Sequence, residues 1–230
     1  MITLYYSPNT YSIAALIVLH ETGLAFRLIE VDLSNQALPD GTDFHDINPK
    51  GYVPVLELED GERITELAVI LSWLADRVPL LRLAPENGTF ERIRFMEALN
   101  FIATEMHKAN SFLLSPRIDD ATAVYYRQWL RGPYEWLDQQ LSTTQWITGD
   151  SFTAADAYAY FAVRQARHLG INLGDLPAVD AFMNKIQARS SVQAVESSRA
   201  ALIDADCRSF PGMPFARPVL SMPTTLLPCM

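Results

Sequence analysis

The residue pattern changes near residue 80, and this change decides which folds are open to the chain. Upstream, β-branched and aromatic runs at residues 2–6 and 26–33 flank a helical run, which is typical of an α/β unit. Downstream, apolar side chains recur every three or four residues, as in amphipathic helices. We therefore predict an α/β domain over residues 1–79, a linker over 80–89 and an all-α domain over 90–206.

Within the α/β domain the predicted order is β-α-β followed by β-β-α. Ser12 is placed to cap the first helix, and Gly23 is placed to end it. After an aperiodic polar stretch, residues 55–58 and 63–65 flank an acidic turn and predict a hairpin. An amphipathic helix over residues 66–78 completes the domain.

The all-α domain begins with a helix predicted over residues 90–114, where a Ser-Pro step ends it. Asp119 or Asp120 then caps a helix that contains Pro133. Proline removes a backbone donor inside a helix, so we expect a kink or a break there.

A capping-box signature at Thr153 and Asp156 precedes an alanine-rich helix that is apolar on most sides. We expect this helix to be the central buried one, and we assign both capping residues to folding. Shorter helices are expected over residues 178–188 and 192–204. Residues 207–230 hold five prolines and several apolar side chains, and we expect them to lie against the body of the protein.

Composition excludes several classes of partner. Eighteen basic and twenty-seven acidic residues give a net charge of −9, which repels phosphate backbones, so no nucleic-acid partner is expected. The longest apolar run is far shorter than the ~20 residues that cross a bilayer, so no membrane association is expected. The N-terminus shows no secretory signal, and we expect a cytoplasmic protein.

The cysteine count restricts the chemistry. Cys207 and Cys229 are the only cysteines, and a disulfide between them stays open. The first 206 residues therefore offer no thiolate nucleophile, no redox pair and no cysteine zinc site. The four histidines show no metal-ligand spacing, so no metal site is expected.

Two neighbouring features suit a small peptide ligand. The Val53-Pro54 step predicts a sharp turn that exposes the backbone of Val53, with either peptide isomer open. The helix that starts near Glu66 and Leu67 presents unpaired N–H groups to a carboxylate, while the Glu66 side chain can hold an ammonium. Glutathione is such a peptide. Alternatively, the proline only ends a loop and Glu66 is an ordinary acid at a helix start.

Several segments resemble one family in order and spacing. NPKGYVPVL at residues 48–56, LEDG at 58–61 and ITELAVI at 64–70 resemble the glutathione-binding half of a glutathione S-transferase. LNFIATEMHK at 99–108 and GDSFTAADAY at 149–158 are similar to the bacterial beta class in particular. The resemblance implies a thioredoxin-like domain followed by an all-α domain, a homodimer, and glutathione as co-substrate.

One departure from the family concerns the thiol site. The beta class has a cysteine at the position of Tyr11, so a mixed disulfide through this residue is closed. A hydroxyl of Tyr11, Ser12 or Thr10 can instead donate to the thiolate of glutathione. Such a bond is worth about 1.5–3 kcal/mol, or about 1–2 pKa units. In the alternative interpretation, the Tyr11 ring packs on the substrate pocket.

Other departures concern ligand contacts. Leu67 stands where the family usually has Ser or Gly, which leaves only its backbone N–H for the ligand, and Gln36 replaces a lysine. These substitutions are expected to weaken glutathione binding. The glutathione-binding residues that the resemblance implies are Thr10, Gln36, Val53, Pro54, Glu66, Leu67 and Asn100.

Asn100 and His107 lie seven residues apart on one predicted helix, hence nearly on the same face. The resemblance directs both toward the sulfur of glutathione, where His107 can donate to the thiolate or accept its proton. The alternative is a structural or surface histidine.

We therefore expect a glutathione transferase-like enzyme that activates the thiol of glutathione, through Tyr11, Ser12 and His107, for attack on a small electrophile in a mainly apolar pocket. The altered thiol site favours a dedicated pathway step in which glutathione adds to, or delivers sulfur to, one intermediate. Two alternatives stay open: a non-catalytic binding or dimerisation module, and glutathione disulfide exchange without a protein cysteine.

Overall fold

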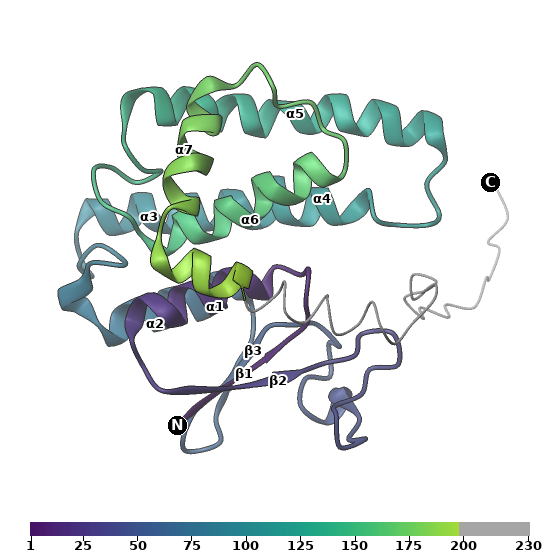
Figure 1. Ribbon diagram of the computed structural model, residues 1–230, viewed down its shortest axis with the longest axis vertical. Helices are drawn as coiled ribbons and strands as arrows, with labels where there is room; N and C mark the ends of the chain where they lie inside the picture. The colour runs from purple at the N-terminus through teal and green to yellow at the C-terminus, as the bar shows by residue number, and fades with distance from the viewer. Residues whose placement is uncertain (198–230) are drawn as a thin grey trace, which may run out of the picture.

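A computed structural model describes residues 1–197 (Figure 1). Its N-terminal half has the predicted β-α-β, β-β-α order. The elements are β1 Ile2–Tyr6, α1 Ser12–Thr22, β2 Phe26–Glu30, the 3-10 helix η1 Phe44–Asp46, β3 Val55–Glu57, β4 Arg63–Ile64 and α2 Leu67–Arg77.

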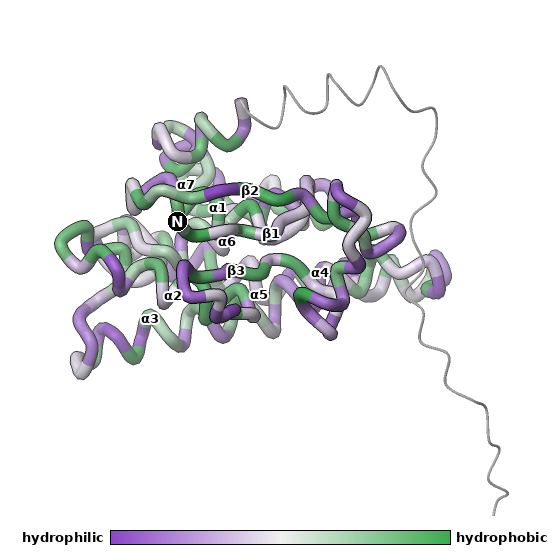
Figure 2. Tube along the Cα trace, turned by 90° about the horizontal axis from the view of Figure 1, so that it is seen from below, coloured by the Kyte–Doolittle hydropathy of each residue, from purple (hydrophilic) through white to green (hydrophobic). Residues whose placement is uncertain are grey.

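The four strands form one mixed sheet in the order β2-β1-β3-β4. Strand β1 pairs in parallel with β2 and antiparallel with β3, so β1 is central and all five of its residues are buried. Figure 2 shows the sheet from below, and in Figure 1 helices α1 and α2 lie between this sheet and the helical half. Covering one face of the sheet in this way buries the apolar side of both layers.

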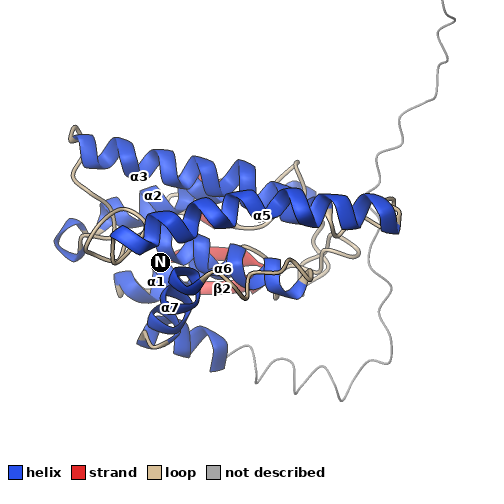
Figure 3. Ribbon diagram, turned by 90° about the horizontal axis from the view of Figure 1, so that it is seen from above, coloured by secondary structure: helices blue, strands red, loops and turns tan. Residues whose placement is uncertain are grey.

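The C-terminal half is helical (Figure 3). Its elements are the 3-10 helix η2 Pro79–Leu81, α3 Phe90–Phe101, the π-helix η3 Ile102–Lys108, α4 Ala109–Phe112, α5 Asp120–Thr143, α6 Ala154–His168 and α7 Pro177–Gln187. Residues 190–197 are also helical.

Helix α6 is the central helix, as predicted. It packs against α1, α2 and α3, and its residues 157–163 are all buried. The Asp156 carboxylate at its start accepts hydrogen bonds from the backbone N–H groups of Thr153 and Ile147, at 2.7 and 2.9 Å. The N-terminal turn of the helix is thereby tied to the loop before it.

One prediction about a helix end was wrong, and of the two outcomes expected inside another helix one is excluded. Ser12 is not the cap of α1, because Tyr11 occupies the capping position and the Ser12 hydroxyl bonds to Ser7 instead. Helix α5 continues through Pro133, so it is not broken there. Gly132 precedes this proline, and because glycine has no Cβ, the proline ring meets no preceding side chain. Of the two candidate caps, Asp119 accepts from the helix.

The helix predicted over residues 90–114 contains a π-helical segment. In η3 each N–H bonds one residue further back than in an α-helix, which widens the turn and changes which side chains share a face. The expected common face of Asn100 and His107 is therefore lost.

Within residues 1–197, no helix combines the length and hydropathy needed to span a membrane. The predicted position of residues 207–230, both cysteines and the end of the helix predicted over residues 192–204 lie outside the described residues. The proposed domain boundaries stay a prediction.

Candidate functional site

A cleft of about 340 Å³ lies between the two halves of the protein. Its volume falls in the range of small-molecule sites. One wall comes from the loop before β3 and the start of α2, and the other from η3, α4 and α6. The lining residues are Asn48, Lys50, Tyr52, Val53, Pro54, Thr65, Glu66, Leu67, Ala68, Ala103, His107, Lys108, Ser111 and Tyr158.

Val53 and Pro54 form the edge of the first wall. The peptide bond between them is cis. Neither the N–H nor the C=O of Val53 has a hydrogen-bond partner among residues 1–197. A backbone donor and acceptor are thus open to the main chain of a peptide ligand, as predicted.

The start of α2 presents further open donors. The carbonyl of Glu66 accepts hydrogen bonds from the N–H groups of Val69 and Ile70. The N–H groups of Leu67 and Ala68, which come earlier in the helix, have no partner in the described part of the chain. The Leu67 side chain is only 5% exposed and packs in the core, so it does not fill the cleft. This helix end can accept a carboxylate.

Glu66 lies at the mouth of the cleft with an exposed side chain. Its backbone has φ of 66°, a conformation that side chains rarely adopt and that is often found at ligand sites. The Lys50 ammonium lies 2.6 Å from its carboxylate and 2.9 Å from the Thr65 hydroxyl. A ligand ammonium would compete with Lys50 for this carboxylate.

His107 lies in η3 and forms part of the second wall of the cleft. Its Nδ1 lies 2.7 Å from the hydroxyl of Tyr158. Its Nε2 has no partner in the described residues and is not among the buried unpaired atoms, so it is open to the cleft. Burial, with the neighbouring charge of Lys108, lowers the pKa of His107 to about 3. The imidazole is therefore neutral near pH 7.

Tyr11 lies behind His107 and does not line the cleft. Its ring stacks on the imidazole with centroids 3.4 Å apart, and its hydroxyl accepts from the Asn110 amide at 3.2 Å. Burial raises the pKa of Tyr11 well above its ordinary value. We therefore correct the expectation for this residue: its hydroxyl is bonded to Asn110 instead of facing the cleft, and its ring packs on His107 without lining the pocket.

Thr10 lies in the loop between β1 and α1, Ser12 is the first residue of α1, and their hydroxyls are bonded to each other. Both hydroxyls also lie within hydrogen-bond distance of the Ser7 carbonyl, at 2.7 and 3.1 Å. Neither residue lines the cleft. Local bonds to Ser7 and to each other therefore occupy two of the three hydroxyls that were expected to activate a thiol.

Gln36 and Asn100 also lie outside the cleft. The Gln36 amide donates to the Leu33 carbonyl at 3.3 Å and packs under Gly51, close to where a Cβ would stand. Asn100 is exposed on α3, and the π-helical segment η3 lies between it and His107. The structure thus brings together Val53, Pro54, Glu66, Leu67 and His107 of the predicted site residues.

Several lining residues were not expected from the sequence, among them Tyr158, Lys50, Tyr52, Lys108 and Ser111. From the sequence, Tyr158 is expected only as a core residue of the central helix. A usable signal was its hydroxyl, because a buried tyrosine needs a hydrogen-bond partner. Ser111 follows His107 by one helical turn, a spacing that also places it near the site.

A larger hollow, of about 740 Å³, lies near the end of α2 and residues 148–153. Its ionisable residues are mainly acidic, and it contains none of the predicted site residues. Within residues 1–197 no group of three or more His, Cys, Asp or Glu side chains is arranged to hold a metal ion. We therefore take the cleft at Val53 and His107 as the candidate site.

Similarity to known proteins identifies the family of this chain. The chain matches the family models "Glutathione S-transferase, N-terminal domain" over residues 10–77 and "Glutathione S-transferase, C-terminal domain" over residues 101–190. Glutathione S-transferase GstA of Escherichia coli O157:H7 is 37% identical over 190 residues, which cover 83% of this chain and 94% of that protein.

Solved structures agree in fold. A sphingomonad glutathione S-transferase complexed with glutathione has a TM-score of 0.83 and 34% identity, over 86% of this chain and 98% of that one. A beta-class glutathione S-transferase of Sphingomonas chungbukensis has a TM-score of 0.82 and 35% identity, with the same coverage. The N-terminal half is accordingly thioredoxin-like and the C-terminal half all-α. The chain therefore belongs to the glutathione S-transferase family and is most similar to its bacterial beta-class members.

Proposed function

We propose that this glutathione S-transferase-type enzyme binds glutathione in the cleft and promotes attack of its thiolate on a small electrophile. The tripeptide main chain would pair with the backbone of Val53, and a carboxylate would lie at the N–H groups of Leu67 and Ala68. Its ammonium would lie at Glu66. The observation that carries this proposal is the pairing of an unpaired backbone edge with a neutral histidine across one cleft.

His107 would activate the thiol by donating a hydrogen bond from Nε2 to the sulfur. A hydrogen bond to a charged acceptor is worth about 1.5–3 kcal/mol, which lowers a thiol pKa by about 1–2 units. The thiol proton leaves to solvent, and a sulfur electron pair forms the bond to the electrophilic carbon. The leaving group departs with its bonding pair.

The electrophile would enter on the side of Ala103, Ser111 and the exposed ring of Tyr52. Lys108 extends over that ring, with Nζ 5.6 Å from its centroid. Ala103, Lys108 and Ser111 belong to the helical half, whereas Tyr52 and the backbone edge for glutathione belong to the α/β half. The two substrates would thus meet between the halves.

We further propose that the reaction is a dedicated step in which glutathione adds to, or delivers sulfur to, one intermediate. Tyr11 in the cysteine position supports a specialised member, because no mixed disulfide can form there. Assays with a panel of electrophiles are expected to show glutathione-dependent turnover of a narrow subset.

The test combines binding with kinetics. Calorimetric titration is expected to show glutathione binding to the wild type and to His107→Ala, because the backbone contacts remain. In His107→Ala, kcat/KM is expected to fall by about 10–100-fold. Absence of both glutathione binding and glutathione-dependent turnover would instead assign the chain to the non-catalytic binding modules.

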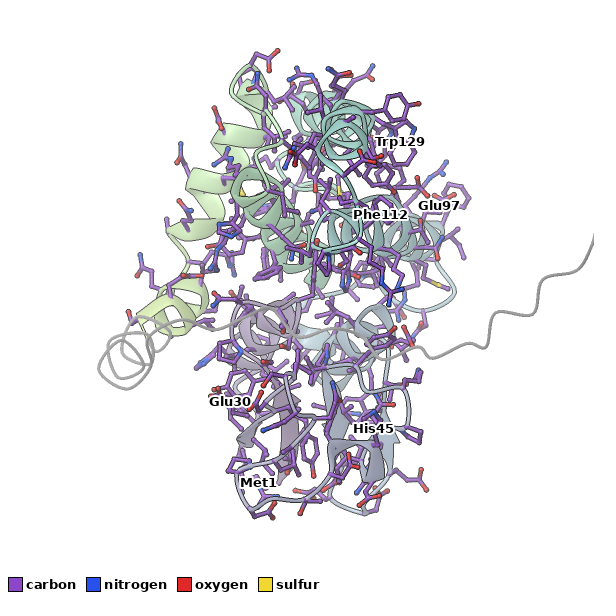
Figure 4. All side chains as sticks on the ribbon, turned by 90° about the vertical axis from the view of Figure 1, so that its right-hand side faces the viewer. Met1, Glu30, His45, Glu97, Phe112 and Trp129 are labelled. Atoms are coloured by element: carbon purple, nitrogen blue, oxygen red, sulfur yellow. The ribbon has the colours of Figure 1, made fainter. Side chains whose placement is uncertain are left out.

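We also propose a homodimer. Helices α3 and α5 expose several large apolar side chains, and an apolar patch on a surface is typical of an interface. Figure 4 shows Glu97, Phe112 and Trp129 along one edge of the helical half. The exposed apolar residues of the two helices include Phe90, Ile93, Met96, Trp129 and Trp136.

A further inference from the structure

His107 is held by two tyrosines from distant parts of the chain, Tyr11 before α1 and Tyr158 in α6. We propose that Tyr158 fixes His107 in the tautomer with its proton on Nε2, and that the Tyr11 ring fixes the imidazole plane so that this proton points into the cleft. Both tyrosines are then positioning residues that act through His107. The catalytic consequence rests on the proposed function, whereas the tautomer does not.

The hydrogen bond of Tyr158 determines the tautomer. The residue is 2% exposed, and Nδ1 of His107, at 2.7 Å, is the only partner of its hydroxyl in the described residues. Burial and the nearby Glu66 carboxylate raise the pKa of Tyr158, so the phenol keeps its proton. A buried phenol donates where an acceptor exists, which makes Nδ1 the acceptor. The proton of the neutral imidazole then resides on Nε2.

The stacking of Tyr11 determines the orientation. Its ring lies 3.4 Å from the imidazole with an interplanar angle of 19°. The ring is itself fixed, because Phe161 and Tyr158 meet it edge-on and Asn110 bonds its hydroxyl. Rotation of the imidazole about its Cβ–Cγ bond would drive it into this ring. A cysteine at position 11 would be too small to prevent this rotation. Tyr11 in place of the cysteine therefore removes the thiol and also orients His107.

The charged and titratable groups around His107 favour the neutral imidazole. Lys108 on the same helix is positive and opposes an imidazolium. The phenols of Tyr11 and Tyr158 are both protonated because burial raises the pKa of each. Glu66 faces Tyr158 across the cleft and is paired with Lys50.

The direct test is nitrogen-15 NMR of the histidine side chains in the full-length protein without glutathione. The wild type is expected to show His107 protonated on Nε2 alone, and Tyr158→Phe is expected to show a mixture of tautomers. Tyr160→Phe is the matched control, because it removes a hydroxyl from the same helix on the side away from the cleft. A wild type protonated on Nδ1, or an unchanged tautomer in Tyr158→Phe, would overturn the proposal.

Kinetics test the consequence for the reaction. Tyr158→Phe is expected to lower kcat/KM by about tenfold in the wild type and to have no further effect in His107→Ala. Tyr11→Leu, which removes the ring, is expected to lower kcat more than Tyr11→Phe, which keeps it. Equal effects of Tyr158→Phe in both backgrounds would refute positioning through His107. If no glutathione-dependent turnover exists at all, the proposed function fails, and the NMR result still decides the tautomer.

Discussion

At the scale of single residues, the charge state of His107 decides what the site can do. A histidine of ordinary pKa could act as a base, because its neutral imidazole readily accepts a proton from a thiol near neutral pH. Burial removes that option and leaves a neutral donor beside the cleft. The activation of glutathione is therefore expected to come from hydrogen bonding rather than from proton abstraction.

The low pKa of His107 predicts a pH dependence of stability. Its pKa is about 3 in the folded protein against 6.5 when unfolded, so between these values the unfolded chain binds more protons. The stabilisation is complete above pH 6.5 and is lost as the pH falls, by about 2 kcal/mol at pH 5. In urea titrations, the stability difference between wild type and His107→Gln is expected to shift by this amount from pH 7 to pH 5. A constant difference would contradict a buried neutral imidazole.

Leu67 separates the role of a side chain from that of its backbone. Leu67→Ala is expected to cost about 2–5 kcal/mol of unfolding free energy, because the side chain packs in the core. Its KM for glutathione should change by less than about twofold, since the N–H remains. Leu67→Pro removes that N–H at the first helical position, where proline is tolerated, and should raise KM. Equal KM values in the two variants would exclude the backbone contact.

At the scale of elements, the start of α6 ties the helical half together. Asp156 accepts from the N–H groups of Ile147 and Thr153 and from the Thr153 hydroxyl. All three residues are buried, so water cannot replace the carboxylate.

Asp156→Ala is therefore expected to lower the unfolding free energy by about 3 kcal/mol or more, because two buried backbone donors lose their acceptor. Asp150→Ala, at an exposed position in the preceding loop, should change it by less than about 0.5 kcal/mol. Chemical denaturation measures both. Similar decreases in unfolding free energy for the two variants would contradict a stabilising role of the Asp156 cap.

Local signals in the sequence were sufficient for most elements. Gly23 ends α1 with φ of 67°, and Thr153 and Asp156 mark the start of α6, since each rule depends on neighbouring residues alone. The π-helix η3, which packs against α5 and α6, carries no such local signal. The seven-residue spacing alone therefore predicts a common face for Asn100 and His107 that the structure does not show.

The sequence predicts the parts of the candidate site that backbone groups form. It does not predict the parts that depend on which hydrogen-bond partner a side chain has. The open backbone groups of Val53 were predicted from the proline that follows it. Those at the start of α2 were predicted because the first N–H groups of any helix lack partners within the helix. Hydrogen bonds within the protein occupy the hydroxyls of Thr10 and Ser12, which bond to Ser7, and of Tyr11, which bonds to Asn110. No sequence pattern shows that these partners compete with a ligand for the hydroxyls.

At the scale of the whole molecule, one apolar core runs through both halves and holds the cleft between them. Leu16 and Leu74 of the α/β half belong to the same buried cluster as Phe95 and Phe161 of the helical half. The two walls of the site are thereby fixed relative to each other, which suits a reaction between two bound substrates.

The proposed homodimer predicts a mass by light scattering twice that of the chain. Met96→Lys places a charge within the exposed apolar surface of α3 and is expected to shift the protein toward the monomer. Leu28→Lys on the edge strand β2 is the control and should leave the dimer intact. A monomeric wild type at assay concentration would refute the dimer.

The central claim is that a cleft without a cysteine holds glutathione with its sulfur at His107 and favours the thiolate. Titrating the ultraviolet absorbance of the thiolate in the bound complex measures this directly. The account predicts a thiol pKa about 1–2 units below that of free glutathione in the wild type, and a value close to the free one in His107→Ala. A bound thiol that titrates like free glutathione in the wild-type protein would contradict it.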